Sequence, residues 1–216
     1  MNMLRKEWVL CMHPTGYIMP LGALLILVPG YPYGVCCFYT GLAIYFICLT
    51  ARENRDAAFT LTLPVSRRDM VRGRILLSVL LEVATLLLMA VFILLKKALG
   101  NAPNPAGLDA GIATLGEGLL LFAFFNMIFF PNYYKDINKP GKAFLLASSV
   151  LFLWIIAEII GTYTAPFLRD VLDQPDPEHM RDKLLFSLGG LALFAASIPV
   201  SIQHSAKKLE EQDLTL

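Results

Sequence analysis

The sequence predicts an all-α integral membrane protein with six transmembrane helices. Hydrophobic residues make up 56% of the 216 residues and charged residues only 16%, whereas a typical soluble domain has about 25% charged residues. Apolar runs long enough to cross a bilayer recur along the chain, and Lys and Arg gather between them. The net charge of +1 provides no global positive field for nucleic acid. We expect a single transmembrane domain over residues 1–216.

Six apolar segments are the candidate spans. Five of them are long enough to cross as α-helices: Tyr33–Thr50, Ile75–Leu95, Ile112–Phe130, Ala143–Gly161 and Leu184–Ile202. The first segment, Gly16–Val28, is shorter and would reach only about 20 Å as an α-helix. We expect it to cross by tilting, by thinning the bilayer, or by continuing back through Pro14 toward Trp8.

Residues 1–13 precede the first span and show a helical stripe. Leu4, Trp8, Cys11 and Met12 share one face, and Asn2, Lys6 and His13 lie elsewhere. The pattern fits an interfacial elbow helix anchored by Trp8 and Lys6, or the cytoplasmic start of span one. A cleaved signal peptide is the further alternative, but His13, Pro14 and Pro20 interrupt the apolar region and no A-x-A site follows.

The distribution of Lys and Arg sets the orientation. One side of the predicted membrane carries thirteen of these residues and the other side five. By the positive-inside rule, both termini are cytoplasmic. We expect a multi-pass protein of a bacterial plasma membrane. The expected layout is the elbow helix (1–13), spans one and two (14–50), a cytoplasmic loop (51–74), spans three and four (75–130), a cytoplasmic loop (131–142), spans five and six (143–202) with an outer loop (162–183), and a tail (203–216).

The loop over residues 51–74, which we call the arginine loop, holds six arginines. The stretch "ARENRDAAF" is expected to continue span two as a helix until Pro64 breaks the chain. Ser66 and Asp69 form a capping box that predicts a new helix from Ser66 into span three. Arg67 and Arg68 would then lie unfavourably beside the positive end of the helix dipole, so lipid phosphates or a partner's carboxylates are expected to compensate.

Four apolar residues of this loop lie outside the predicted bilayer: Phe59, Leu61, Leu63 and Val65. No attached soluble domain is available to bury them. An apolar strip surrounded by charges is typical of a protein-docking surface. The alternative is a loop that dips into the lipid interface.

The stretch "ENRDAAFTLTLPVSRRDMVRGR" resembles the cytoplasmic loop of ABC transporter permeases of the type-2 exporter family. The residues that carry the likeness are Leu61, Leu63, Pro64, Val65, Ser66, Arg67 and Arg68. The N-terminal "LRKEW" resembles the family's elbow helix, and "KKLEEQDL" resembles its short charged C-terminus. With six spans, the resemblance covers essentially the whole chain.

The resemblance implies a coupling helix that docks on a cytoplasmic ABC ATPase subunit. Its contact helix would contain Glu53, Asn54, Arg55, Asp56 and Phe59, with residues 61–68 as the turn behind it. A six-span chain is half a transporter in this family, which implies a homodimer or a heterodimer with a similar permease, embedded in membrane lipids. The chain has no G-x-x-x-x-G-K-[ST] sequence. We therefore expect no catalytic residue and no cofactor here, with ATP and Mg²⁺ on the partner ATPase.

Four polar residues inside the spans are candidates for a substrate path: Glu82, Glu117, Asn126 and Glu158. Ionisable groups within a membrane are costly and mark functional sites. Glu82 would lie about 10 Å from the cytoplasmic face, where it lines a route or makes a packing hydrogen bond. Glu117 and Glu158 fall near the outer ends of their spans, where they could reach water. Asn126 is expected to form an interhelical hydrogen bond.

Aromatic residues, histidines and cysteines, and the outer loop give three further predictions. The aromatic residues Phe129, Phe130, Tyr133 and Tyr134 are expected to form an inner interfacial belt. The three histidines are far apart and the four cysteines have no zinc-site spacing, so no metal site is expected. In the outer loop, the apolar residues between Ala165 and Leu172 fit a re-entrant helix or a surface helix.

Three functions compete. The first is a permease that moves a peptide or other amphipathic substrate outward, driven by a separate ATPase. The second is a non-transporting assembly or immunity protein that docks a cytoplasmic partner. The third, a membrane-embedded enzyme, would need catalytic groups clustered at one depth. The spans contain no histidine, and their carboxylates lie at different depths, so the sequence favours the first.

Overall fold

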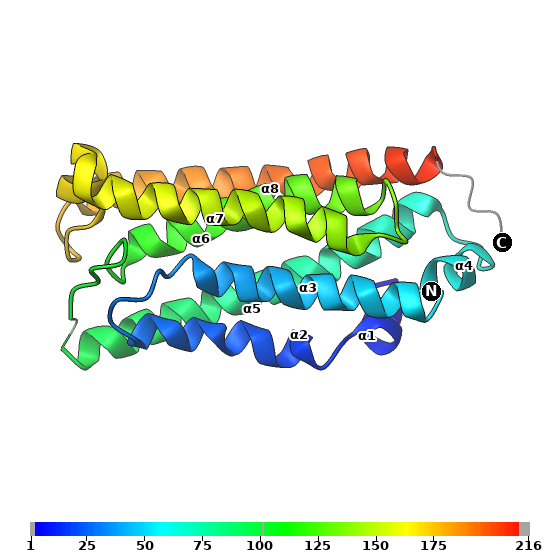
Figure 1. The fold of residues 1–216 in the computed structure, drawn as a ribbon, viewed down its shortest axis with the longest axis horizontal. Helices are drawn as coiled ribbons and strands as arrows, with labels where there is room; N and C mark the ends of the chain where they lie inside the picture. The colour runs from blue at the N-terminus through cyan, green and yellow to red at the C-terminus, as the bar shows by residue number, and fades with distance from the viewer. Residues whose placement is uncertain (1–2, 101, 212–216) are drawn as a thin grey trace.

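The computed structural model describes residues 3–100 and 102–211, and within these ranges it is all helical, with no strand. Long helices run side by side along the longest axis of the molecule (Figure 1). Residues 1–2 of the expected elbow helix and 212–216 of the expected tail lie outside the described residues. The elements are α1 (Met3–Cys11), α2 (Thr15–Ile18), the 3₁₀ helix η1 (Met19–Leu27), α3 (Val35–Glu53), α4 (Asp56–Leu61), α5 (Arg67–Ala98), α6 (Ile112–Tyr133), α7 (Pro140–Thr164), the π-helix η2 (Leu168–Leu172) and α8 (Met180–Glu210).

Five helices of the described residues, α3, α5, α6, α7 and α8, are long and apolar enough to cross a membrane. A sixth span results if α1 is joined to α2 and η1 as one segment bent by 106°. The all-helical membrane class is confirmed. The full six-span layout stays a prediction, because its first span depends on that bent pair.

The first candidate span is longer than its residue count predicts. Met19–Leu27 forms a 3₁₀ helix, which rises about 2.0 Å per residue instead of about 1.5 Å. With the preceding turn of α2, the segment extends about 24 Å, compared with about 20 Å for the same residues as an α-helix. The bend after α1 also turns the elbow helix away from the axis of this segment.

Helix α6 is the most buried of the five long helices, and α8 is the most exposed. The two pack closely because glycines face each other across the contact. A Cβ added at Gly190 would lie 2.6 Å from the backbone oxygen of Gly116. Small residues allow such close approach of helices in membranes. The apolar residues on the outer faces of α5, α7 and α8 remain exposed on the isolated chain.

The two ends of the bundle differ in content. Helices α1 and α4 and the end of α8 lie together at one end, and the loops before α6 and before α8 lie at the other (Figure 1). At the loop end, Asp176 forms ion pairs with Lys97 and Lys183 at 2.7 and 3.1 Å. The N-terminal helix and the arginine loop thus share one end, which is consistent with the orientation predicted from the charge count.

The predicted inner aromatic belt is wrong. Phe129, Phe130, Tyr133 and Tyr134 are buried inside the chain and do not face lipid. The ring of Phe129 stacks on those of Phe125 and Tyr133 with centroids 4.9 and 5.9 Å apart. Because α6 packs against α8, α7, α5 and α3, these four aromatic side chains meet other helices and form part of the hydrophobic core.

Candidate functional site

The arginine loop folds as the short helix α4 between two candidate spans. Helix α3 ends at Glu53, and α4 begins at Asp56 after a sharp turn. Arg55 occupies the turn with φ of 51°, in the left-handed region where non-glycine residues are uncommon. The expected continuous helix through "ARENRDAAF" is therefore wrong. The turn at Asn54 and Arg55 redirects α4, so that Asp56 faces the interior.

Four charged side chains meet beneath α4, and we call them the charge cluster: Lys6 and Glu7 from α1, Asp56 from α4 and Arg74 from α5. Lys6 Nζ lies 2.7 Å from Asp56 Oδ1 and 2.8 Å from Glu7 Oε1. Arg74 Nη2 donates to Asp56 Oδ2 at 2.9 Å, and Arg74 Nε donates to Glu7 Oε2. Each of the four residues is at most 6% exposed. The cluster joins α1, α4 and α5.

The charges of the cluster balance, because two cations face two carboxylates. Lys6 Nζ also donates to the hydroxyl of Thr60, at 2.8 Å, which ties α4 to α1 at a second point. Removing one partner from such a buried set leaves an uncompensated charge and is strongly destabilising. The expected role of Lys6 as a lipid-facing anchor is therefore wrong, whereas Trp8 on the other face of α1 is exposed.

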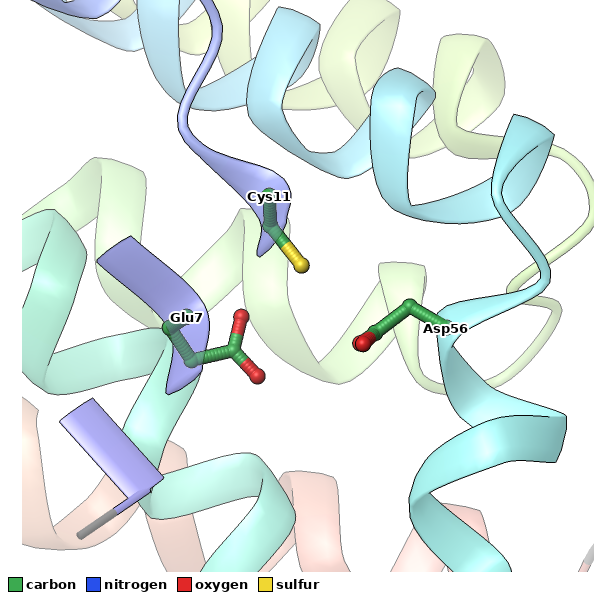
Figure 2. A group of neighbouring side chains, drawn as sticks. All are labelled: Glu7, Cys11 and Asp56. Atoms are coloured by element: carbon green, nitrogen blue, oxygen red, sulfur yellow. The ribbon is translucent and has the colours of Figure 1, made fainter. Parts of the chain in front are cut away.

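Glu7, Cys11 and Asp56 point toward one another (Figure 2), and one ligand atom from each lies within 4.8 Å of the others. Such donors could in principle hold a metal ion. Both carboxylates, however, already contact Lys6 and Arg74, and Arg74 Nη2 lies 3.3 Å from Cys11 Sγ. An added cation would meet the positive charge of these two side chains. The geometry therefore favours an internal ion-pair network over a metal centre.

Most of the residues predicted to contact an ATPase lie on the surface. Asp56 is the exception, because it is buried in the charge cluster. Phe59, in the six-residue helix α4, is 50% exposed. The exposed members are Glu53, Asn54, Arg55, Phe59, Pro64, Ser66 and Arg68, and the half-buried members are Leu61, Leu63, Val65 and Arg67. Whether this surface binds a partner stays a prediction.

A cavity of about 310 Å³ lies beside α4 and reaches the charge cluster. Its lining includes Arg52 from the end of α3, Arg55 from the turn and Tyr133 from the end of α6. Asp56 and Arg74 of the charge cluster also line it. On the other side of α4, a second hollow is lined by Phe59 together with Leu10, Asn54 and Asp56. Helix α4 therefore lies between two depressions, and a partner protein could fit its surface into them.

Helix α5 begins as the capping pattern predicts. The Ser66 hydroxyl accepts the backbone N–H of Asp69 at 3.1 Å, and α5 starts at Arg67. Arg67 Nη1 donates to the backbone oxygen of Leu209 at 2.7 Å, at the end of α8. The negative end of the α8 dipole thus compensates Arg67 from within the chain. The expected external anion is not needed at this residue, and Arg68 remains exposed.

Of the substrate-path candidates, Glu82 and Asn126 come together. Asn126 Nδ2 donates to Glu82 Oε2 at 3.0 Å, and both side chains are fully buried between α5 and α6. The interhelical hydrogen bond expected of Asn126 is confirmed. In this conformation Glu82 takes part in helix packing, and its role in a substrate path stays a prediction.

Glu117 and Glu158 lie nearer the loop end of the bundle than that pair does. Both line a cavity of about 240 Å³ between α6, α7, η2 and α8. They are 2% and 6% exposed, so the expectation that they reach outer water is wrong. The cause is the outer loop: Leu168 and Leu172 of η2 form part of the wall over the cavity. The sequence analysis correctly placed the two carboxylates near the outer ends of their helices. It could not show that η2 covers them.

Three members of the charge cluster escaped the sequence analysis as site residues: Lys6, Glu7 and Arg74. One signal was available for Arg74, which is the last arginine of the loop and directly precedes a long apolar run. Lys6 and Glu7 are adjacent opposite charges in the nine-residue helix α1. The sequence could not pair them with Asp56, because that contact depends on the turn at Arg55.

Comparison with known proteins agrees with this architecture. A family model described as "ABC-2 family transporter protein" matches residues 2–210. Searches of curated proteins and of solved structures found no match. The family match includes the elbow helix, the arginine loop, the charge cluster and all the long helices. A bundle of membrane-length helices with a short surface helix between two of them is therefore the permease component expected of such a transporter, and the chain belongs to the ABC-2 transporter membrane family.

Proposed function

We propose that this chain is the permease subunit of an ATP-driven exporter and that α4 is the coupling helix that docks on a separate cytoplasmic ATPase. The ATPase would bind ATP and Mg²⁺, since no P-loop sequence occurs in this chain. The family match supports a permease that works with an ATPase partner. The cargo we expect is a peptide or other amphipathic molecule that moves outward.

The observation that carries the proposal is the connection between α4 and the long helix α5. Asp56 on the inner face of α4 pairs with Arg74, and Arg74 belongs to a helix of 32 residues. On its exposed side, α4 presents Phe59 to solvent. A force applied to the exposed face would thus reach α5 through a buried ion pair, and α1 through Lys6. A loop that merely dipped into lipid would have no need of this connection.

The assembly we propose contains two permease chains in a bacterial plasma membrane, with both termini in the cytoplasm. The long helices expose rows of large apolar side chains, among them Leu87 and Leu94 on α5 and Leu185 and Leu188 on α8. Lipid or a second permease can cover these faces. A homodimer and a heterodimer with a similar permease both satisfy this requirement.

The first test is purification of the chain from its native host in mild detergent, followed by mass spectrometry. The proposal expects a soluble subunit with a P-loop in stoichiometric amount. The matched variant is Phe59→Glu, which should release that subunit. Leu99→Glu, a change to an exposed apolar residue at the loop end of the bundle, is the control and should retain it. Recovery of the chain alone in several detergents would contradict the proposal.

Transport distinguishes an exporter from a protein that only docks a partner. Replacing Leu63 and Val65 with Asp should uncouple ATP hydrolysis from substrate movement while the helices remain folded. ATP-dependent movement of cargo in the wild type, lost in this variant, supports coupling through the loop. A complex that hydrolyses ATP but moves no tested peptide or amphiphile would favour the assembly or immunity function.

A further inference from the structure

The cavity at the loop end combines apolar walls with two buried carboxylates. Its lining is Leu108, Glu117, Trp154, Ala157, Glu158, Phe167, Leu168, Leu172 and Phe186. None of these residues is cationic, and every one except the two glutamates is apolar or aromatic. Ala157 and Phe167 are exposed, so the rim of the cavity lies at the surface beside α7.

Both carboxylates have an oxygen without a partner among the described residues. Oε1 of Glu117 and Oε2 of Glu158 are buried and accept no hydrogen bond there. The indole Nε1 of Trp154 is buried beside Glu117 and acts as a hydrogen-bond donor to that carboxylate. Burying a carboxylate oxygen unpaired is costly. Two buried carboxylate oxygens without a hydrogen bond at a single cavity indicate a missing ligand.

Glu158 is held in place by the loop before α6. Its Oε1 accepts the backbone N–H of Leu108 at 2.6 Å. The approach depends on Gly107, whose φ of 132° is rare for other residues and where an added Cβ would overlap that same oxygen. The other oxygen of Glu158 is left available. This arrangement fixes the orientation of the Glu158 carboxylate toward the cavity.

Basic residues at this end are engaged elsewhere, and Arg169, which follows Leu168, pairs with Asp170. Lys97 and Lys183 both pair with Asp176, and neither lines the cavity. The cavity therefore requires its positive charge from a ligand. Aromatic rings on its walls, those of Trp154, Phe167 and Phe186, can attract a cation through their faces as well as pack against apolar groups.

We infer that this cavity binds an organic ammonium ion attached to an apolar chain, with the ammonium between Glu117 and Glu158 and the apolar part against the aromatic wall. The volume of about 240 Å³ is below the roughly 300–1,000 Å³ of sites for drug-sized ligands. The cavity therefore takes a small amphiphilic amine or one amine-bearing segment of a larger cargo. The assignment of this amine as cargo rests on the proposed permease function, whereas the binding itself does not.

The chain supplies its own reporter for the test. Trp8 and Trp154 are its two tryptophans, and Trp8 lies in α1 at the other end of the bundle. In a Trp8→Phe background, Trp154 fluorescence reports on the cavity alone. We would titrate the purified full chain in lipid nanodiscs with octylamine that carries a bromine at the end of its chain. Bromine quenches tryptophan on contact. The brominated octanol of the same length is the neutral control probe.

The expected result is saturable quenching by the amine, with at least tenfold weaker binding when Glu117→Gln and Glu158→Gln are combined. Glu178→Gln, a change to an exposed carboxylate at the same end, should bind as the parent does. Ala157→Leu narrows the rim without changing charge, and it should also weaken binding. This last variant alters an exposed position, so it keeps the test valid if the double variant fails to fold.

Equal quenching by the amine and the alcohol would overturn the inference, because it would reflect partition into lipid alone. Amine binding that is unchanged in the double variant and in Ala157→Leu would also overturn it. The measurement requires no ATPase. Its failure would therefore leave the permease proposal intact, and failure to recover an ATPase would leave a positive binding result in place.

Discussion

The two ends of the bundle bury the same kinds of charged side chain in opposite ways. In the charge cluster beneath α4, each carboxylate meets both a lysine and an arginine at ion-pair distance. In the cavity at the loop end, Glu117 and Glu158 lie in apolar surroundings without a cationic neighbour in the lining. The first set of carboxylates has its countercharges within the chain, whereas the lining of the cavity supplies none for the second set.

This difference separates a structural role from a binding role. A buried and balanced network fixes the relative positions of the segments that contribute to it. A buried carboxylate without a cation is stable only if it is protonated or if a ligand supplies the missing charge. The cluster is therefore suited to transmit movement from α4, and the cavity is suited to take a cationic molecule.

The largest effect is expected from breaking the balanced set. Arg74→Met should lower the free energy of unfolding by about 3–5 kcal/mol, because it leaves two buried carboxylates facing only Lys6. Thermal unfolding of the purified chain in one fixed detergent would measure the loss. Arg72→Met, which removes an exposed arginine two residues earlier in the same helix, should change stability by less than about 0.5 kcal/mol.

A double variant sharpens this experiment. Adding Asp56→Asn to Arg74→Met removes one of the stranded carboxylates and restores the balance of charge. We expect part of the lost stability to return. If Arg74→Met alone matched Arg72→Met, the four side chains would be solvated and the cluster would not be a rigid connection.

Much of the fold could be predicted from the sequence, because apolar runs and caps are local signals. Ser66 and Asp69 predicted the start of α5, and the apolar run after Arg74 predicted its course. Contacts between segments were beyond such reasoning. The turn at Arg55 has no strong sequence signal, because neither glycine nor proline marks it, yet it determines that Asp56 faces inward.

The candidate site divides in the same way. The exposed residues of the arginine loop were found from composition and from a family resemblance, since both are properties of one stretch. The contacts between elements in the charge cluster join residues that are 18 to 67 positions apart, and one sequence gives no sign of such pairing. The two glutamates were found as charges inside apolar runs. Helix η2 covers them only because the outer loop folds back over the cavity. The sequence left two alternatives open for this loop, a re-entrant helix and a surface helix.

A smaller effect is expected at the start of the same helix that carries Arg74. Ser66→Ala removes the hydroxyl that caps Asp69 and should lower the free energy of unfolding by about 1 kcal/mol. Ser66→Asp, which keeps a capping acceptor, should stay close to wild type. The same thermal assay applies. A loss as large as that of Arg74→Met would mean that the cap, and not the ion pairs, organises this end of the bundle.

Removing a carboxylate from the cavity at the loop end should not lower the free energy of unfolding, in contrast to breaking the charge cluster. Glu117→Gln removes a carboxylate that has no cationic partner, so stability without ligand should be unchanged or should rise by up to about 1 kcal/mol. Glu158→Gln retains an oxygen that can accept from Leu108 and should behave similarly. Unfolding midpoints measured in the absence of any added amine would check both. A marked loss of stability would reveal a hidden partner and would remove the contrast between the two ends.

A last contrast concerns two aspartates of the outer loop, which lie outside the candidate spans. Burial raises the pKa of Asp173 to about 6, although the N–H of Asp109 donates to it at 2.8 Å and opposes the rise. Burial also acts to raise the pKa of Asp176, but hydrogen bonds from Lys97 and Lys183 outweigh it and lower that pKa below its usual range.

These two directions predict opposite dependences on pH. Folded Asp173 holds a proton between about pH 4 and pH 6 that the unfolded chain has lost, so its contribution to stability declines as pH rises through that window. Asp176 contributes above about pH 4 and loses its contribution only as pH falls further through its lowered pKa. The difference in unfolding midpoint between wild type and Asp173→Asn should therefore change between pH 4.5 and pH 7, with the variant gaining relative stability at the higher value. An identical difference at both pH values would mean that water already solvates Asp173, and that incomplete pairing at this end is confined to the cavity.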